Sequence, residues 1–215
     1  MTAIENVALY HSIARSMRPG DVILLEAVRN PLATIIRAVQ GSPISHCGCI
    51  SQAIHPQDPN AQDVVMGECT IHNGVSGAQR HSLLEVLQTR YPDGRAWLGR
   101  LSDRNRARLD LARFYEFLGD AECTVKYGVV NLFEYLLRTI PILGMRIFQS
   151  EDKHRMVCDS FVIAWLQYAG ERNGLLQGVN YQLETPQQLA EARIYSGPAV
   201  QIWGEPKEIP KFNTI

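Results

Sequence analysis

The sequence predicts a mixed α+β fold in which a small antiparallel sheet packs against helices. Short apolar runs bounded by turn residues fill the first half of the chain, and apolar residues at helical spacing recur towards both ends. The chain has 215 residues, of which 46% are hydrophobic and 20% are charged. This is the balance of a globular protein with enough apolar material for its own core. We therefore expect residues 1–215 to form a single domain.

Strands are expected in the middle of the chain and helices at both ends. Short apolar runs predict strands over 22–25, 44–53, 64–69, 97–101 and 199–203. Helical spacing predicts helices over 2–17, 31–39, 103–118 and 156–169, with a helical signal near 83–87 and a short helix from Thr185 to Arg193.

Three features complete the expected organisation. The helix over 103–118 is expected to be capped by Ser102 and ended by Gly119 and Asp120. The stretch 73–94 is polar apart from its one helical signal. The apolar segment of about 128–149 is expected to be a helical insertion.

Charge is nearly balanced along the chain. There are 21 basic and 22 acidic side chains, and the net charge is -1. The stretch 100–113 is locally basic, but Asp103 and Asp110 interrupt it, as on a solvated helix face. A phosphate backbone requires a concentrated positive field. The sequence therefore predicts no nucleic-acid partner.

Cysteine usage and the N-terminal residues indicate where the chain is made. Five cysteines, an odd number, argue for reduced thiols and against a disulfide framework. Residues 1–17 lack the apolar run of a signal peptide, and no segment reaches the roughly 18 uninterrupted apolar residues of a spanning helix. We expect a protein that is cytoplasmic as synthesised, without a spanning membrane segment. Export by a route that uses no signal peptide remains open.

The helix expected over 156–169 carries a cysteine in its first turn. Val157, Phe161 and Trp165 recur at the spacing of one buried face, and Cys158 lies beside that face. Free amide N–H groups and the positive end of the helix dipole favour a thiolate at this position. Cys158 is therefore either a structural core residue or a nucleophile.

The strand expected over 44–53 carries a histidine. Alternation places His46, Gly48 and Ile50 on one face, and Cys47 and Cys49 on the other. Gly48 has no side chain, so it leaves space beside His46 for another group to approach. This histidine is either a core residue with satisfied hydrogen bonds or a catalytic base.

The next expected strand, 64–69, contains a glutamate within an apolar run. A buried carboxylate is costly without a partner, and His46 is the natural partner for Glu68. A carboxylate fixes the tautomer of a catalytic imidazole and stabilises its cation. An edge-strand glutamate that faces water is the alternative.

Two segments together resemble a known family. Residues 157–162, VCDSFV, followed by Tyr168-Ala169-Gly170, are similar to the nucleophile helix of NlpC-type papain-like cysteine peptidases. Residues 44–50, ISHCGCI, resemble the histidine strand of that family. Here the histidine precedes the cysteine. This is the order of the circularly permuted branch, which contains YiiX-like proteins and relatives of lecithin:retinol acyltransferase.

Further matches extend the resemblance over about residues 17–203. Residues 18–24, RPGDVIL, resemble the opening strand of that branch, and Glu68 with Gly74-Val75 resembles the strand after the histidine. Residues 119–127 resemble the lead-in to the nucleophile, and Thr185-Pro186 resembles the terminal helix. The resemblance implies a permuted papain-like fold.

Matched position by position, the resemblance implies a role for each candidate site residue. Cys158 matches the nucleophile, His46 the general base and Glu68 the third, orienting residue. The backbone N–H of Cys158 would contribute to an oxyanion hole. Tyr127 would line the site, and Gly48 would leave room in it. The chain departs from the family pattern in having Asp159 and Cys47, and in the apolar segment 128–149.

The resemblance implies a thiol hydrolase that works through an acyl-enzyme and needs no cofactor. The expected substrate is an amide bond of a peptidoglycan-type peptide, as for an amidase or endopeptidase. The apolar segment leaves open a lipid acyl hydrolase or acyltransferase that acts on ester or thioester bonds. A cell-wall target would require delivery to the periplasm of a target cell, as for a secreted antibacterial effector. An inhibitory partner protein is then among the expected partners.

Two other interpretations remain open on the residues alone. His46, Cys47, Cys49, Cys69 and His72 are ligand types that zinc prefers, but their spacings match no standard finger or ribbon, so no metal site is expected. A non-catalytic binding module on the same fold is the other alternative.

Overall fold

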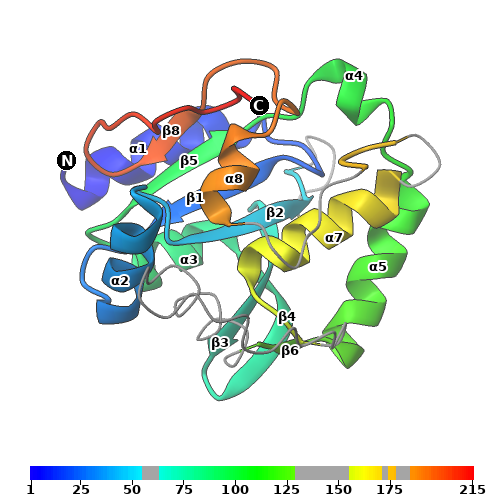
Figure 1. Cartoon of the computed structure of the whole chain (residues 1–215). Helices are drawn as coiled ribbons and strands as arrows, with labels where there is room; N and C mark the ends of the chain where they lie inside the picture. The colour runs from blue at the N-terminus through cyan, green and yellow to red at the C-terminus, as the bar shows by residue number, and fades with distance from the viewer. Residues whose placement is uncertain (55–62, 129–154, 171–173, 178–184) are drawn as a thin grey trace.

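The computed structural model describes residues 1–54, 63–128, 155–170, 174–177 and 185–215 (Figure 1). Its helices are Ala3–Ala14 (α1), Pro31–Gln40 (α2), Leu83–Arg90 (α3), Asp103–Arg106 (α4), Leu111–Thr124 (α5), Cys158–Gly170 (α7) and Pro186–Glu191 (α8). Its strands are Val22–Glu26 (β1), His46–Gln52 (β2), Val65–His72 (β3), Val75–Ser82 (β4), Arg95–Gly99 (β5), Lys126–Tyr127 (β6), Arg155–Met156 (β7) and Val200–Trp203 (β8).

A six-stranded antiparallel sheet organises the fold, in the order β4-β3-β2-β1-β5-β8. The short strands β6 and β7 form a separate parallel pair. The expected α+β class with an antiparallel sheet is thus confirmed. The sheet is larger than expected, because β4 adds a strand at one edge.

The sheet separates two apolar cores. Alternate residues of β1 point to opposite faces, so Val22 and Leu24 join one core and Ile23 and Leu25 join the other. The first core lies between the sheet and α5, α7 and α8, and the second lies between the sheet and α1 and α3 (Figure 1). All five residues of β1 are buried, as expected for a central strand.

Local signals explain the first two helices. Thr2 and Glu5 form a reciprocal capping box at the start of α1. Asn30 caps α2, Pro31 occupies its first turn, and Gly41 ends it in the left-handed conformation with φ 60°. The predicted helices over 2–17 and 31–39 are therefore confirmed.

The single helix predicted over 103–118 is wrong. Ser102 does cap a helix, but α4 ends at Arg106. Asp110 caps a second helix by accepting hydrogen bonds from the N–H groups of Ala112 and Arg113. α5 then continues through Gly119 to Thr124, because a glycine inside a helix lowers its stability without ending it.

Strand β4 was not predicted from the polar stretch 73–94. It pairs with β3 along its whole length, through a turn at Asn73 and Gly74, whose φ angles are 49° and 77°. An Asn-Gly pair is a strong hairpin signal. The weak hydrophobicity of β4, an edge strand, concealed it. The helical signal at 83–87 is confirmed as α3.

Most of the predicted insertion at 128–149 lies outside the described residues, and so does most of the predicted loop between β2 and β3. The single domain stays a prediction. Among the described residues, every helix is too short or too polar to cross a membrane.

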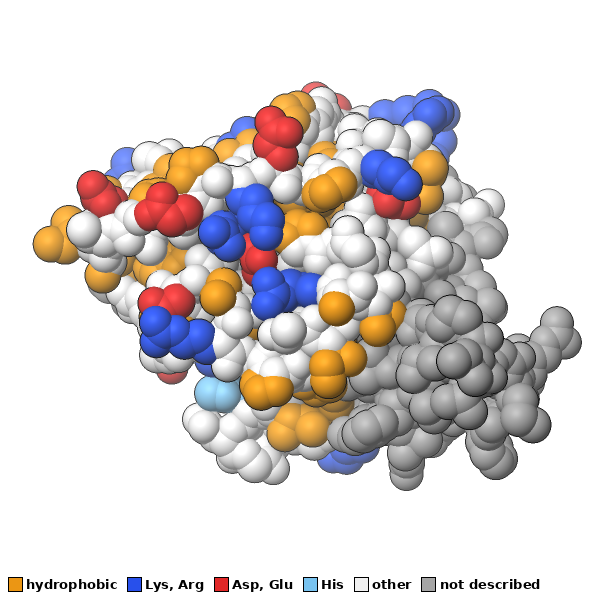
Figure 2. All heavy atoms as spheres, turned by 60° about the vertical axis from the view of Figure 1, so that its left-hand side comes forward, with side chains coloured by type: hydrophobic (Ala, Val, Ile, Leu, Met, Phe, Trp, Pro, Cys, Tyr) orange, Lys and Arg blue, Asp and Glu red, His pale blue; other side chains and the backbone are white. Residues whose placement is uncertain are grey.

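One buried carboxylate joins three segments of the chain. Glu26, at the end of β1, is 1% exposed and pairs with Arg37 at 2.9 Å, Arg95 at 2.8 Å and Lys207 at 2.9 Å. These cations come from α2, β5 and the C-terminal segment. Figure 2 shows basic and acidic side chains interspersed on one face of the molecule.

A glycine on β3 determines how closely α7 can approach the sheet. A Cβ atom at Gly67 would lie 2.7 and 2.8 Å from ring carbons of Trp165. We expect Gly67→Ala to lower the free energy of unfolding by about 1–3 kcal/mol, because the buried ring must shift. Gly119→Ala, where nothing lies within 4 Å of the new Cβ, should instead add about 0.5–1 kcal/mol. Urea denaturation measures both, and equal effects would contradict this account.

Candidate active site

Cys158 occupies the first position of α7. The Val157 carbonyl accepts a hydrogen bond from the N–H of Phe161 at 3.0 Å, which closes the first helical turn. Further along, Trp165 stacks on Phe114 with ring centroids 4.3 Å apart and donates its indole N–H to the Phe114 carbonyl at 2.7 Å. This packing holds α7 against α5, and α7 also contacts β2 and β3. Cys158 itself is 5% exposed.

His46 and Glu68 meet across β2 and β3. His46 Nε2 lies 2.5 Å from Glu68 Oε2, and the Glu68 side chain has no exposed surface. The strand register pairs Cys49 with Gly67, so extending it places Glu68 opposite Gly48 and diagonal to His46. The two side chains therefore share one face of the sheet.

Gly48 lies on the same face, and the space beside its Cα atom is already occupied. A Cβ atom at Gly48 would meet the sulfur of Met66 at 2.5 Å and the Gly67 carbonyl at 3.0 Å. The group that approaches Gly48 is thus Met66. Gly48 allows close packing of β2 against β3 beneath His46.

The end of α3 and strand β4 supply further groups around Glu68. Arg90 Nη2 binds Glu68 Oε1, and His81 Nε2 lies 3.7 Å from the same oxygen. Burial disfavours the carboxylate, but His46 and Arg90 outweigh it and lower the pKa of Glu68 to about 2. Glu68 is therefore an ionised, buried anchor for the imidazole.

The imidazole of His46 connects Glu68 to Cys158. Burial disfavours the imidazolium, but Tyr91, Cys158 and Glu68 together raise the pKa of His46 well above its usual value. Its hydrogen bond to Cys158 must use Nδ1, because Nε2 is bound to Glu68. His46 therefore has the two hydrogen bonds of an oriented catalytic base.

The sulfur of Cys158 is favoured as a thiolate. The largest contribution that lowers the pKa of Cys158 is a hydrogen bond from the Cys47 thiol, and the charge and hydrogen bond of His46 lower it further. The backbone N–H of Cys47 also contributes, and together these groups outweigh burial and hold the pKa of Cys158 well below that of an ordinary thiol. The ladder between β2 and β3 begins at Cys49, which leaves this N–H available to the sulfur.

Two further side chains lie close to the sulfur. Asp159 Oδ1 is 3.7 Å from Cys158 Sγ and is almost fully buried. Burial, and after it the charge of Cys158, raises the pKa of Asp159 well above its usual value. Tyr127 is half-buried in β6, and burial with the nearby Cys158 charge raises the pKa of its phenol.

The structure therefore brings Cys158, His46 and Glu68 into one hydrogen-bonded chain, with Tyr127 close to its sulfur end. Sequence reasoning missed Arg90 and Tyr91. Both stand at the C-terminal end of α3, and no local pattern marks either of them as a partner of β3.

The candidate zinc ligands are arranged differently. Cys69 donates its thiol hydrogen to the Met156 carbonyl at 3.2 Å, and His72 packs edge-on against His81. In the part of the chain that the structure describes, no three His, Cys, Asp or Glu side chains gather as they would around a metal ion.

Comparison with known proteins adds no family assignment. No protein-family model matches the chain, and no curated protein matches it significantly.

The ionised Glu68 makes the stability of the folded protein depend on pH. Its pKa falls from 4.5 to about 2 on folding, so it stabilises the native state above about pH 4.5, and this contribution disappears as the pH falls through about 2. The contribution amounts to about 3 kcal/mol. We expect Glu68→Gln to be less stable than wild type at pH 7, with the difference shrinking towards pH 2. Urea denaturation across that range measures it, and a constant difference would contradict the expectation.

Proposed function

We propose that the protein is a cysteine hydrolase in which Cys158 is the nucleophile, His46 the general base and Glu68 the orienting residue. The observation that carries the proposal is the continuous chain from the buried Glu68 through His46 to the sulfur of Cys158. A carboxylate, an imidazole and a thiol in this order are the parts of an activated thiol nucleophile.

The proposed reaction follows from these positions. His46 holds the proton of Cys158, and the thiolate attacks a substrate carbonyl. Backbone N–H groups at the start of α7, including that of Cys158, stabilise the oxyanion. The imidazolium then protonates the leaving group. Water, activated by His46, releases the acyl group from the sulfur.

The fold proposed for this reaction is the circularly permuted papain-like fold. Its support is the chain order, with His46 before Cys158, and the packing of α7 against β2 and β3, which carry the other two residues. The resemblance of residues 44–50 and 157–162 to the NlpC-type family points the same way.

For the substrate we propose an amide bond in a peptidoglycan-type peptide. This choice rests on the family resemblance, as do delivery to a target cell's periplasm and an inhibitory partner protein. An ester or thioester acyl substrate would use the same three residues, so the experiment must separate the two classes.

The experiment incubates purified protein with peptidoglycan sacculi and, separately, with fatty-acyl esters and thioesters. We expect new primary amines from the sacculi, and we expect Cys158→Ala to remove this release. Cleavage of the acyl esters alone would transfer the proposal to lipid acyl hydrolysis or acyl transfer. Inactivity towards both classes, with an unreactive Cys158, would favour the non-catalytic binding module.

A further inference from the structure

A basic cluster surrounds the carboxylate of Glu26 at the end of β1. It consists of the guanidinium groups of Arg37 and Arg95 and the ammonium of Lys207, each 2.8–2.9 Å from a carboxylate oxygen. Burial disfavours the charged form of Glu26, but the hydrogen bonds of Lys207 and Arg95 outweigh burial and lower its pKa. Three cations thus share one anion, which leaves two positive charges in excess.

The acidic side chains nearest to the cluster in sequence do not remove this excess. Glu205 binds the N-terminal ammonium, and Asp93 binds Arg29 at 3.1 Å. Glu208 follows Lys207 and is exposed, and even when it is counted one positive charge is left over. Like charges held close together repel each other, so a further anion at the cluster would lower the free energy.

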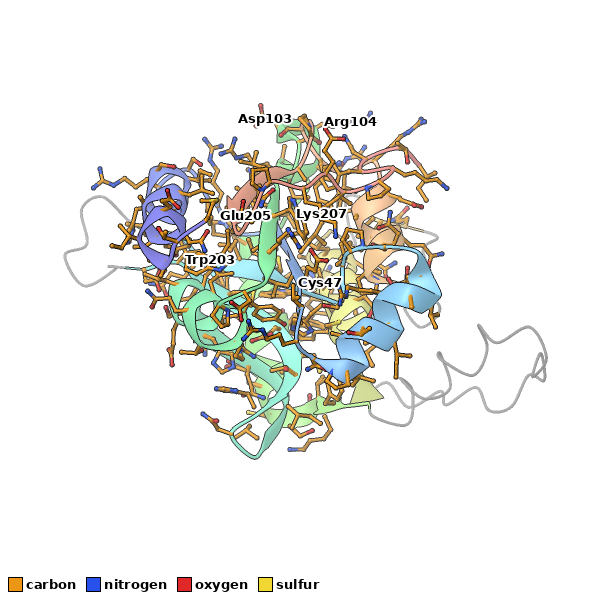
Figure 3. The ribbon with its side chains drawn as sticks, turned by 90° about the vertical axis from the view of Figure 1, so that its left-hand side faces the viewer. Cys47, Asp103, Arg104, Trp203, Glu205 and Lys207 are labelled. Carbon is orange, nitrogen blue, oxygen red and sulfur yellow. The ribbon has the colours of Figure 1, made fainter. Side chains whose placement is uncertain are left out.

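The cluster is open to solvent and has hydrogen-bond donors to spare. The side chains of Arg37, Arg95 and Lys207 are 21%, 24% and 40% exposed. Arg95 uses Nη1 for Glu26 and Nε for the Glu205 carbonyl, and its Nη2 makes no hydrogen bond to a residue that the structure describes. The ammonium of Lys207, in the segment that follows β8 (Figure 3), has three N–H donors, and one of them binds Glu26.

The cluster lies beside the strand that carries the proposed catalytic base. β1 and β2 pair Leu25 with His46. Glu26 therefore stands opposite Ser45, the residue before His46. The N–H of Ser45 donates to the Leu25 carbonyl at 2.8 Å, and its hydroxyl accepts a hydrogen bond from the N–H of Ala27 at 2.9 Å. These bonds tie both neighbours of Glu26 to the residue next to the base.

The cluster and the proposed nucleophile share one face of the sheet. Side chains alternate along β1, so Glu26 points to the same face as Leu24, which lies in one core with Cys158. Adjacent strands are about 4.8 Å apart and each strand residue advances about 3.3 Å, so the cluster is a few residue lengths from His46. An extended substrate bound at Cys158 can span that distance.

We infer that Arg37, Arg95 and Lys207 bind a carboxylate of the substrate that lies a few residues from the scissile amide. The inference rests on the proposed function, because it places this carboxylate relative to Cys158 as the nucleophile. Guanidinium and ammonium groups pair with carboxylates through charge-assisted hydrogen bonds. The site would thus select peptides that have an acidic side chain or a free C-terminus near the bond that is cleaved.

The test uses two alkylating reagents that differ in one charge. N-iodoacetyl-glutamic acid α-amide has a free γ-carboxylate, and N-iodoacetyl-glutamine α-amide is neutral and of the same size. We expect the acidic reagent to alkylate Cys158 about five- to tenfold faster near pH 6 and low ionic strength. A thiolate by itself repels an anionic reagent, so this preference requires a cationic partner. Peptide mass spectrometry measures both rates.

Lys207→Gln removes the most exposed cation of the cluster and should lower the ratio of the two rates at least about threefold. Lys211→Gln is the matched control, because it removes the same charge from the same C-terminal segment. Lys211 is exposed and is not one of the cations that bind Glu26, so its substitution should leave the ratio within about twofold of wild type. Thermal melting of each variant verifies that it is folded.

Each other outcome counts against a stated proposal. Rapid alkylation of Cys158 at equal rates by the two reagents would overturn the inference and leave the proposed hydrolase intact. A ratio that is unchanged in Lys207→Gln, or that falls equally in Lys211→Gln, would also overturn the inference alone. If Cys158 reacts with both reagents no faster than the exposed Cys123, both proposals are overturned.

Discussion

Replacing His46 by alanine is expected to slow the alkylation of Cys158 near pH 6 by about 30- to 100-fold. An ordinary thiol with a pKa of about 8.5 is well under 1% thiolate at that pH, so a stabilised thiolate reacts far faster. His46 supplies both a charge and a hydrogen bond to the sulfur. The thiol and amide of Cys47 and the N-terminus of α7 still stabilise the thiolate in this variant. The alkylation rate should therefore stay above that of an ordinary thiol. Iodoacetamide labelling followed by peptide mass spectrometry measures the rate.

His81→Ala is the matched control for this experiment. His81 approaches the same carboxylate, 3.7 Å from Glu68 Oε1, but it lies on β4 and the groups that lower the pKa of Cys158 do not include it. We expect His81→Ala to leave the alkylation rate within about twofold of wild type. Equal rates in His46→Ala and wild type would show that the imidazole does not activate Cys158.

Removing the buried carboxylate is expected to have the largest effect on stability. Glu68→Ala should lower the free energy of unfolding by about 3–5 kcal/mol, because it leaves Arg90 and the His46 imidazolium buried without their partner. Glu68→Gln retains the shape and one acceptor oxygen, so it should cost less. Urea denaturation at pH 7 measures both variants.

An exposed ion pair provides the control. Glu122 binds Arg80 through two contacts of 2.7 Å, but the Arg80 side chain is 53% exposed. Glu122→Ala should therefore cost less than about 1 kcal/mol. If Glu68→Ala were no more destabilising than Glu122→Ala, the buried network around Glu68 would not be the anchor described above.

The contact between His46 and Glu68 could be predicted from the residue types. Strand alternation placed His46 beside Gly48 on one face of its strand, and a buried carboxylate such as Glu68 requires a partner. The first turn of α7 followed from the apolar spacing around Cys158. The face of His46 and the start of α7 depend only on neighbouring residues of one strand or one helix, and sequence periodicity records such neighbours directly. The register that brings Glu68 diagonal to His46 is set by the pairing of β2 with β3.

Arg90 and Tyr91 could not be predicted, because their place depends on tertiary packing. They reach Glu68 and His46 only because the β3–β4 hairpin returns the chain and positions the end of α3 beside β3. The hairpin itself had a signal in Asn73-Gly74, which the polar composition of β4 concealed.

The hydrogen bonds from Cys47 to Cys158 have a similar origin. They require the β2–β3 ladder to begin at Cys49, which leaves the amide of Cys47 available. Alternation correctly separates Cys47 from the face of His46, but it does not show that α7 brings Cys158 within reach of both residues.

The most direct test of the central claim is the alkylation rate of each of the five cysteines in the folded wild-type protein as a function of pH. The account predicts that Cys158 reacts rapidly near pH 6. Cys47, Cys49 and Cys69 should stay unreactive because burial raises the pKa of each thiol. The exposed Cys123 serves as the accessible reference thiol. A Cys158 that reacts no faster near pH 6 than Cys123 would contradict the account.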